Sequence, residues 1–353
     1  MADLGWDSDW QATFSPYAGE AAPGRIVRVD RSLCGVLTRA GLVRASLGGS
    51  ALEAVSIDSL AAPCTGDWCA VRHWSDGPST VEALLPRRSA VTRADSKGTS
   101  RGQVLAANVD VVAVVVALHP EPNMARIERF LSLAWQSGGM PVVLLTKADV
   151  VSDAEHIADD VRRFAPGVTV LCTSTVTGAG LEAVAELIGT ARTMVLLGAS
   201  GHGKSSLANA LLRAKILVIK DIRDDGKGRH TSVRRELLVV PGGGAVIDTP
   251  GLRGVGIQES AAGIAATFPD VEALVDECRF FDCAHDSEPG CAVQAAVADG
   301  DLPLRRLSSW LALQREQRWM ATRSDARLRS EQPQKWRQLS KDARAAASRK
   351  SRP

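Results

Sequence analysis

The sequence predicts a multidomain protein with a small N-terminal β-barrel, a central doubly wound α/β domain and a mostly helical C-terminal part. Its 353 residues exceed the length of one typical domain. Short apolar runs separated by turn residues occupy residues 24–91, and strand and helix patterns then alternate around a glycine-rich loop. Cysteine and histidine residues gather near the C-terminal end of the chain. Each of these three observations predicts one part of the fold.

Residues 1–23 carry Asp, Ser, Pro and Gly without an apolar period, and we expect a flexible arm there. Residues 24–91 hold several short strand patterns separated by turns, which predicts a small barrel of the OB-fold type, with an SH3-like barrel as the alternative. Trp68 and Trp74 are expected in its core. The expected strands are 25–29, 34–38, 42–47, 68–74 and 81–85.

Residues 92–103 are polar and are expected to form a linker. Over residues 104–255 strands and helices alternate, which predicts the doubly wound α/β domain. The run 109–118 is almost wholly Val and Ala, as in a strand buried on both faces of a parallel sheet. Further strands are expected at 141–146, 168–172, 193–197, 235–240 and 245–248, and helices at 124–136, 161–164, 181–188 and 205–212.

A phosphate-binding loop is predicted at residues 198–205, where GASGHGKS matches G-x-x-x-x-G-K-[ST] between an expected strand and an expected helix. Glycines let backbone N–H groups surround phosphate oxygens, and the helix N-terminus adds partial positive charge. We expect Lys204 to bridge the β- and γ-phosphates and act in catalysis, and Ser205 to ligate Mg²⁺. The predicted nucleotide contacts here are Gly198, Ala199, Ser200, Gly201, His202, Gly203, Lys204, Ser205 and Ser206.

The base is predicted from a Thr-Lys-Ala-Asp segment that follows the expected strand 141–146. Asp149 can accept two hydrogen bonds from guanine, whereas adenine would leave this carboxylate unpaired. The stem of Lys147 can cover the purine ring. Thr146 stands where such segments usually have Asn, so its share of the base contact stays open. The remaining predicted base contacts are Ala148, Ser174 and Thr175.

Magnesium and switch residues are predicted between positions 226 and 251. Asp248 begins an Asp-Thr-Pro-Gly segment after an apolar strand, so we expect it to hold Mg²⁺ through water and Gly251 to contact the γ-phosphate. The loop around Gly-Arg-His-Thr-Ser at 228–232 suits a switch that the γ-phosphate orders. Thr231 is the expected Mg²⁺ ligand, with Ser232 as the alternative.

The guanine-reading segments precede the phosphate-binding loop, which is the reverse of their order in ordinary GTPases. The sequence therefore predicts a circularly permuted GTPase domain, a change that costs little when the original termini are adjacent.

Three cysteines and one histidine lie within fourteen residues in the expected C-terminal domain, 256–302. Three thiolates and one imidazole form the ligand set of a closed structural zinc site, and free thiols beside a surface histidine are the alternative. The predicted ligands are Cys278, Cys283, His285 and Cys291.

The basic tail, residues 303–353, carries fourteen Lys or Arg against four Asp or Glu. The net charge of the whole chain is +2, so the remainder is acidic. A basic tail on an acidic body favours a nucleic-acid partner over a merely solubilising tail. We expect a helix over 304–329 with Leu307, Trp310, Leu311 and Leu313 on its apolar side.

These motifs together resemble the ribosome small-subunit-dependent GTPase family, the RsgA/YjeQ type, over about residues 24–300. Local matches are Leu85–Ser89, Gln103–Asp110, Gly228–Thr231 and Asp248–Leu252. The resemblance implies an OB-fold, a permuted GTPase domain and zinc on the four cluster residues. It also implies rRNA binding and action in late small-subunit maturation, with hydrolysis stimulated by that subunit.

Leu252 stands where many GTPases carry a water-orienting Gln. The resemblance points to His230 for that catalytic task, and contact with ribosomal RNA is the other interpretation of this residue. Two different functions stay open: a nucleotide-gated RNA-binding module with incidental hydrolysis, and an ATP-dependent enzyme, against which Asp149 argues. With no secretion signal and no long apolar stretch, we expect a cytoplasmic monomer without a membrane partner.

Overall fold

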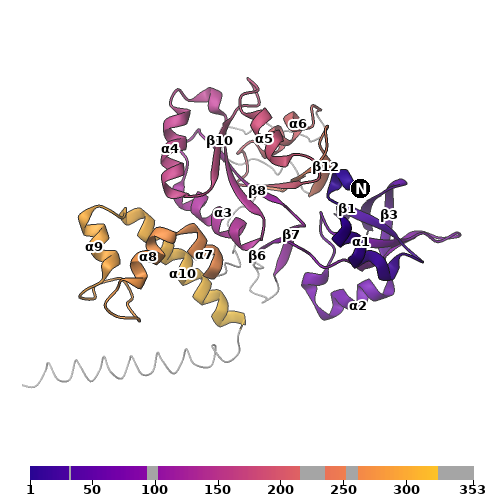
Figure 1. The fold of residues 1–353 in the computed structure, drawn as a ribbon, viewed down its shortest axis with the longest axis horizontal. Helices are drawn as coiled ribbons and strands as arrows, with labels where there is room; N and C mark the ends of the chain where they lie inside the picture. The colour runs from indigo at the N-terminus through magenta and orange to yellow at the C-terminus, as the bar shows by residue number, and fades with distance from the viewer. Residues whose placement is uncertain (32, 94–101, 215–234, 252–260, 325–353) are drawn as a thin grey trace, which may run out of the picture.

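Three folded parts follow one another in the computed structural model, which describes residues 1–31, 33–93, 102–214, 235–251 and 261–324. The barrel and the C-terminal helices lie on different sides of the central α/β domain (Figure 1). No helix in these ranges is long and apolar enough to cross a membrane.

The N-terminal barrel is closed by strands in the order β1-β2-β3-β5-β4 and is an OB-fold. Alternate residues of its strands, such as Ile26, Val36 and Val71, fill a small core. Helix α2, Gly49–Ile57, was not predicted. Trp68 is fully buried as expected, but Trp74 is about half exposed and stacks under Arg72. The strands are β1 Ala22–Asp30, β2 Leu33–Thr38, β3 Gly41–Leu47, β4 Trp68–Arg72 and β5 Ser79–Leu84.

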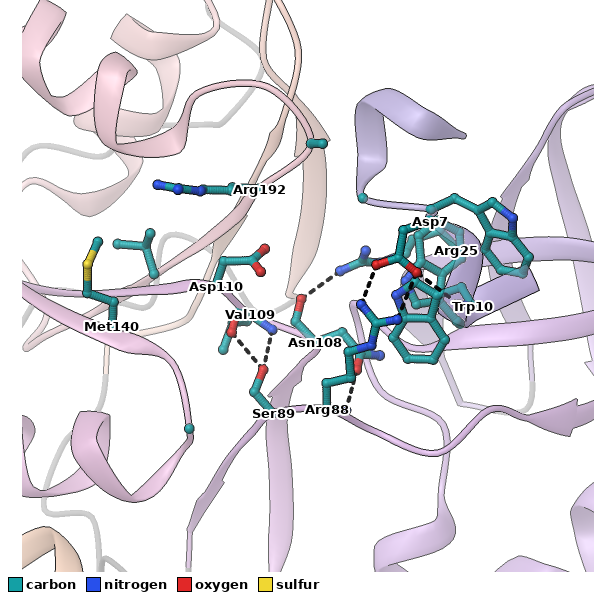
Figure 2. A pocket seen from close by; sticks show the side chains of 16 residues that line it. Asp7, Trp10, Arg25, Arg88, Ser89, Asn108, Val109, Asp110, Met140 and Arg192 are labelled. Atoms are coloured by element: carbon teal, nitrogen blue, oxygen red, sulfur yellow. Dashed lines mark hydrogen bonds and ion pairs between the residues drawn. The ribbon is translucent and has the colours of Figure 1, made fainter. Parts of the chain in front are cut away.

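The expectation of a flexible arm over residues 1–23 is wrong. The short helix η1, Ala2–Leu4, is followed by α1, Ser8–Phe14, and η2, Ser15–Tyr17. Leu4, Trp10 and Phe14 are buried in a cluster that also contains Trp68 of the barrel. The segment contains too few apolar side chains to show a helical period in the sequence. The burial of two aromatic rings, Trp10 and Phe14, stabilises it in the folded chain. Arg88 lies over the Trp10 ring (Figure 2).

The linker expected at 92–103 is also corrected at both of its ends. Strand β6, Ala90–Arg93, pairs antiparallel with β7, Gln103–Ala107. Residues 94–101 lie outside the described ranges.

The central sheet has six strands in the order β10-β9-β8-β11-β13-β12. All neighbouring pairs are parallel except β12 with β13. Every residue of β8 is buried, as its Val- and Ala-rich sequence predicted. The bounds are β8 Val111–Ala117, β9 Met140–Thr146, β10 Thr169–Thr173, β11 Thr193–Leu197, β12 Glu236–Val239 and β13 Ala245–Asp248.

Helices cover both faces of this sheet, which confirms the doubly wound fold. Alternate strand residues pack with α3, Met124–Gln136, and α4, Ala154–Phe164, on one face. The other alternate set packs with α5, Leu181–Ile188, and α6, Lys204–Leu211.

The C-terminal part has its own core under α7, Ala261–Thr267, α8, Pro269–Asp276, α9, Ala292–Asp299, and α10, Leu304–Ser324. Leu307, Trp310 and Leu313 are buried in it, which supports the apolar side expected for α10.

Buried ion pairs join the C-terminal part to the central domain. Arg306 is 1% exposed and pairs with Glu128 of α3, at 3.0 Å, and with Asp270 of α8. Arg305 contacts the same Glu128 carboxylate at 3.1 Å. Separating the partners of such a buried pair would leave an uncompensated buried charge, which is strongly destabilising. These contacts therefore hold the C-terminal helices in one position against α3.

Candidate nucleotide site and metal cluster

The predicted nucleotide-binding segments meet at one edge of the central sheet. Because β9, β10, β11 and β13 are parallel, their carboxyl ends lie on the same side. The segments at 146–149, 174–175, 198–205 and 248–251 directly follow these four strands. This is where open α/β sheets bind their ligands.

The glycine-rich loop between β11 and α6 has a backbone that depends on glycine. Gly198 has φ 152°, and a Cβ there would lie 2.3 Å from the carbonyl oxygen of Val115. Lys204 is 6% exposed, and its Nζ donates to the carbonyl oxygens of Gly198, at 3.0 Å, and Ala199, at 2.8 Å. The ammonium group is therefore folded back inside the loop.

Burial lowers the pKa of Lys204 to about 8, and the nearby carboxylate of Asp248 partly opposes this. The ammonium form still predominates at neutral pH. A bound phosphate would stabilise that form further, since an opposite charge favours ionisation.

Ser205 and Asp248 are adjacent, as a shared magnesium site requires. Ser205 Oγ donates to Asp248 Oδ2 at 2.8 Å, although the two residues come from different elements. Asp248 is 1% exposed at the end of β13. Gly251 approaches the loop so closely that a Cβ on it would lie 2.6 Å from the Cα of Ser200.

The guanine-reading segments are tied to each other and to the glycine-rich loop. The Oγ of Ser174 donates to Oδ1 of Asp149. Thr146 Oγ1 donates to the carbonyl oxygen of His202 at 2.8 Å. This hydrogen bond joins the guanine-reading segment to the glycine-rich loop. The contact between these distant segments was not predicted from the sequence. Lys147 lies in the left-handed region, at φ 60°.

Some predicted site residues are not tested by this geometry. His230, Thr231 and the alternative Ser232 lie outside the described residues, as do Leu252 and the end of the helix expected over 304–329. Thr175 is exposed beside the buried Ser174.

The four predicted metal-ligating residues converge in the C-terminal part, although the chain between them is irregular. The candidate ligand atoms of Cys278, Cys283, His285 and Cys291 all lie within 4.8 Å of one another. His285 Nδ1 is 3.6 Å from the sulfurs of both Cys278 and Cys291, which are themselves 3.9 Å apart. Cys291 also caps α9 by accepting from the backbone N–H of Gln294.

These separations fit a tetrahedral metal ion. Zinc bonds of about 2.0–2.3 Å to nitrogen and sulfur place neighbouring ligand atoms roughly 3.3–3.8 Å apart. The cluster could therefore hold one metal ion with all four positions taken by protein, an arrangement suited to structure rather than to catalysis.

The fold and the site define a P-loop GTPase in circularly permuted order. The family model described as RsgA GTPase matches residues 84–258. The small ribosomal subunit biogenesis GTPase RsgA of Streptomyces avermitilis is 49% identical, over 98% of this chain and 93% of the relative. The relative of the same name from Opitutus terrae is 40% identical, over 98% of this chain and 97% of the relative. The chain belongs to the RsgA GTPase family, and it is a GTPase.

Solved structures agree with this membership. The crystal structure of YjeQ from Thermotoga maritima aligns with TM-score 0.60 and 25% identity, covering 84% of this chain and 98% of that one. The structure of YloQ, described as a circularly permuted GTPase, aligns with TM-score 0.56, covering 84% and 95%. At 22% identity this second likeness concerns the fold alone. The predicted barrel, permuted domain and helical C-terminal part are confirmed.

Proposed function

We propose that the chain binds GTP with Mg²⁺ at the carboxyl edge of its central sheet and hydrolyses it during maturation of the small ribosomal subunit. The observation that carries the proposal is the meeting of three separate segments at this edge. Ser205 of the glycine-rich loop touches Asp248 at the end of β13, and Thr146 of the guanine-reading segment touches the same loop at His202.

The phosphates would lie on the loop 198–205, with backbone N–H groups and the start of α6 facing them. Lys204 would leave its two carbonyl partners for the β- and γ-phosphates. Ser205, Asp248 and Thr231 would hold Mg²⁺, which supplies charge neutralisation between the phosphates. Gly251, close against Ser200, would contact the γ-phosphate. Hydrolysis needs a group to orient water, and we assign His230 to it.

Guanine would be recognised by Asp149, which lies next to Ser174. Lys147 would cover the ring, and Ala148 and Thr175 would complete the pocket with backbone groups. We assign Thr146 a positioning task, since its hydroxyl donates to the loop.

Asp149→Asn is expected to weaken GTP binding about ten- to hundredfold, which corresponds to roughly 1.5–3 kcal/mol for a charged hydrogen-bonding group. An amide matches xanthine better than guanine, so XTP binding should improve. Titration of both nucleotides into parent and variant measures this, with Asp153→Asn, an exposed carboxylate nearby, as the control. Equal GTP affinity in parent and Asp149→Asn would show that Asp149 does not read the base.

We assign one structural zinc ion to the four-residue cluster. The close sulfur and nitrogen atoms support this, since three cysteines and one histidine are the ligand set of a closed structural zinc site. Zinc would contribute folding free energy to a part of the chain whose core is small.

The partner is proposed from the relatives, whose name places them in small ribosomal subunit biogenesis. The chain covers nearly their whole length, so the same partner is expected here. A soluble, cytoplasmic, monomeric protein that contacts ribosomal RNA fits that task. The excess of positive charge after Pro303 supports the RNA contact.

Removing residues 330–353 is expected to weaken binding to the small subunit and to flatten its salt dependence. This truncation deletes seven Lys and Arg residues and none of the proposed GTP or zinc ligands. Each lost phosphate contact should reduce the slope of log affinity against log salt by about one. Basal GTP turnover should not change. Subunit binding measured at several salt concentrations checks this, and an unchanged affinity and slope would place RNA recognition wholly in the folded domains.

A nucleotide-gated RNA-binding module remains the second candidate, because Leu252 replaces the usual water-orienting Gln. In that case the small subunit would bind in a GTP-dependent manner without accelerating turnover.

A further inference from the structure

The turn between α8 and α9 presents two adjacent aromatic side chains to solvent. Phe281 is fully exposed and Phe280 is partly exposed, whereas Phe268 and Trp310 of the same C-terminal part are buried in its core. We call residues 279–282 the aromatic tip. The exposed rings contribute nothing to the core, and burying them against a partner would remove a large apolar area from water.

The backbone around the metal cluster holds the aromatic tip in one conformation. The N–H of Cys283 donates to the carbonyl oxygen of Phe280 at 3.3 Å, which closes a turn with Phe281 at its corner. The N–H of Arg279 donates to the carbonyl oxygen of Gly290 at 3.1 Å, so the tip is also tied to the chain just before α9. Cluster residues flank the tip on both sides. A ring on so constrained a turn loses little conformational entropy on binding, which suits a binding anchor.

The surface around the aromatic tip is acidic. From residue 276 to residue 290 the sequence contains five Asp or Glu residues and one basic residue, Arg279. Outside this stretch, Arg318 of α10 and Glu272 of α8 both lie near His285, and their charges offset each other. Three thiolates around one Zn²⁺ ion would leave a further net negative charge. The fully exposed acidic residues are Asp276, Glu277, Asp282 and Asp286.

This charge determines which kind of macromolecule the tip suits. An RNA strand carries a negative charge on every phosphate, so the carboxylates would repel it even where a base could stack on Phe281. A protein surface with an apolar pocket and a basic rim suits both features, because the pocket buries the rings and the rim attracts the carboxylates. The tip thus differs from the basic segment after Pro303, whose charge suits RNA.

We propose that the aromatic tip docks on a basic protein surface of the small ribosomal subunit. Phe281 inserts into an apolar pocket there, and the exposed carboxylates face Lys or Arg side chains around it. The inference rests on the proposed function, which places this chain on that subunit. Helices α8 and α9 lie at the end of the molecule away from the barrel, so this contact leaves the barrel uncovered (Figure 1).

Binding of the full chain to purified small subunits, with a non-hydrolysable GTP analogue in the nucleotide site, measures the contribution of the ring. Phe281→Ser should weaken binding about tenfold or more, the loss typical of a buried anchor. Basal GTP turnover, zinc content and thermal unfolding should match the parent, since the ring lies outside the core. Ile57→Ser, at an exposed side chain that ends α2, is the control and should bind like the parent.

Charge reversal separates a protein partner from RNA by the sign of its effect. Asp276→Lys combined with Asp282→Lys should weaken binding about tenfold or more, because like charges then meet. If the tip faces RNA, the same variant should bind more tightly. Glu53→Lys combined with Glu186→Lys makes the same charge change on α2 and α5 and should not weaken binding. Should the first double variant lose zinc, Asp276→Lys alone gives the same test, since a cation suits the C-terminal end of α8.

Phe281→benzoylphenylalanine, a photoreactive variant, identifies the partner directly. On irradiation with small subunits we expect an adduct with a ribosomal protein that ribonuclease does not change, joined at a peptide with Lys or Arg beside apolar residues. The inference is overturned by an adduct that ribonuclease shortens, by tighter binding of the charge-reversal variant, or by equal binding of Phe281→Ser and the parent. If the parent itself does not bind small subunits, the proposed function fails, and this inference fails with it.

Discussion

Lys204→Ala is expected to reduce GTP hydrolysis at least about 10²–10³-fold, the loss typical when one charge-stabilising group is removed from an active site. Lys204 is the buried cation of the glycine-rich loop, and its Nζ contacts only backbone carbonyl oxygens of that loop among the described residues. The substitution removes a cation near the buried carboxylate of Asp248, which keeps its hydrogen bond from Ser205, so the fold should persist.

Turnover of GTP by purified parent and variant, with circular dichroism as the check on folding, measures this effect. Arg163→Ala removes a cation from the exposed side of α4 and should leave turnover unchanged. A folded Lys204→Ala protein with parental turnover would mean that phosphate binds elsewhere.

Cys283→Ser is expected to abolish the binding of about one zinc ion per chain and to unfold the C-terminal part. Structural zinc sites contribute roughly 10–16 kcal/mol of apparent binding free energy in isolated zinc-finger peptides, and losing one of four ligands removes much of it. The core beneath α7 to α10 is small, and Cys291 also caps α9, so metal loss should loosen these helices together.

Elemental analysis and thermal unfolding measure the two effects. Cys172→Ser is the matched control, since Cys172 is a half-buried thiol of the central sheet outside the cluster. The zinc assignment fails if the native protein carries no zinc and the three cluster thiols react freely with a thiol reagent, or if both variants retain one equivalent of zinc.

Most of the central domain could be predicted because its strands are uniformly apolar and its motifs are long. The strand expected at 193–197 and the helix expected at 124–136 have those bounds in the structure. The glycine-rich loop motif also predicted the elements on either side of it, since such a loop follows a strand and precedes a helix.

The errors fall where order depends on contacts between distant segments. The helices of the N-terminal segment were missed because they are stabilised by contacts of Trp10 and Phe14 with Trp68, which lies far along the chain. A pattern within the segment alone does not show such contacts. In the same way, the hydrogen bond from Thr146 to His202 joins residues whose proximity only the sheet creates. The strand pair β6 and β7 was missed because its two halves flank a polar segment.

Trp74 was misjudged for a related reason. It follows a buried strand, and its size suggested a core position, but the strand ends at Arg72 and the ring turns outward beneath that residue. The spacing of the four cluster residues, by contrast, was sufficient to predict that their side chains meet. Metal ligands in so short a span can converge without any regular element between them.

GTP turnover with purified ribosomal subunits tests most directly whether this GTPase acts on the small ribosomal subunit. Rates are compared with small subunits, with large subunits and with neither, at one salt concentration. We expect small subunits alone to accelerate hydrolysis, and Lys204→Ala to abolish the accelerated rate. Equal turnover under all three conditions, with small subunits bound, would contradict the account and favour a nucleotide-gated RNA-binding module.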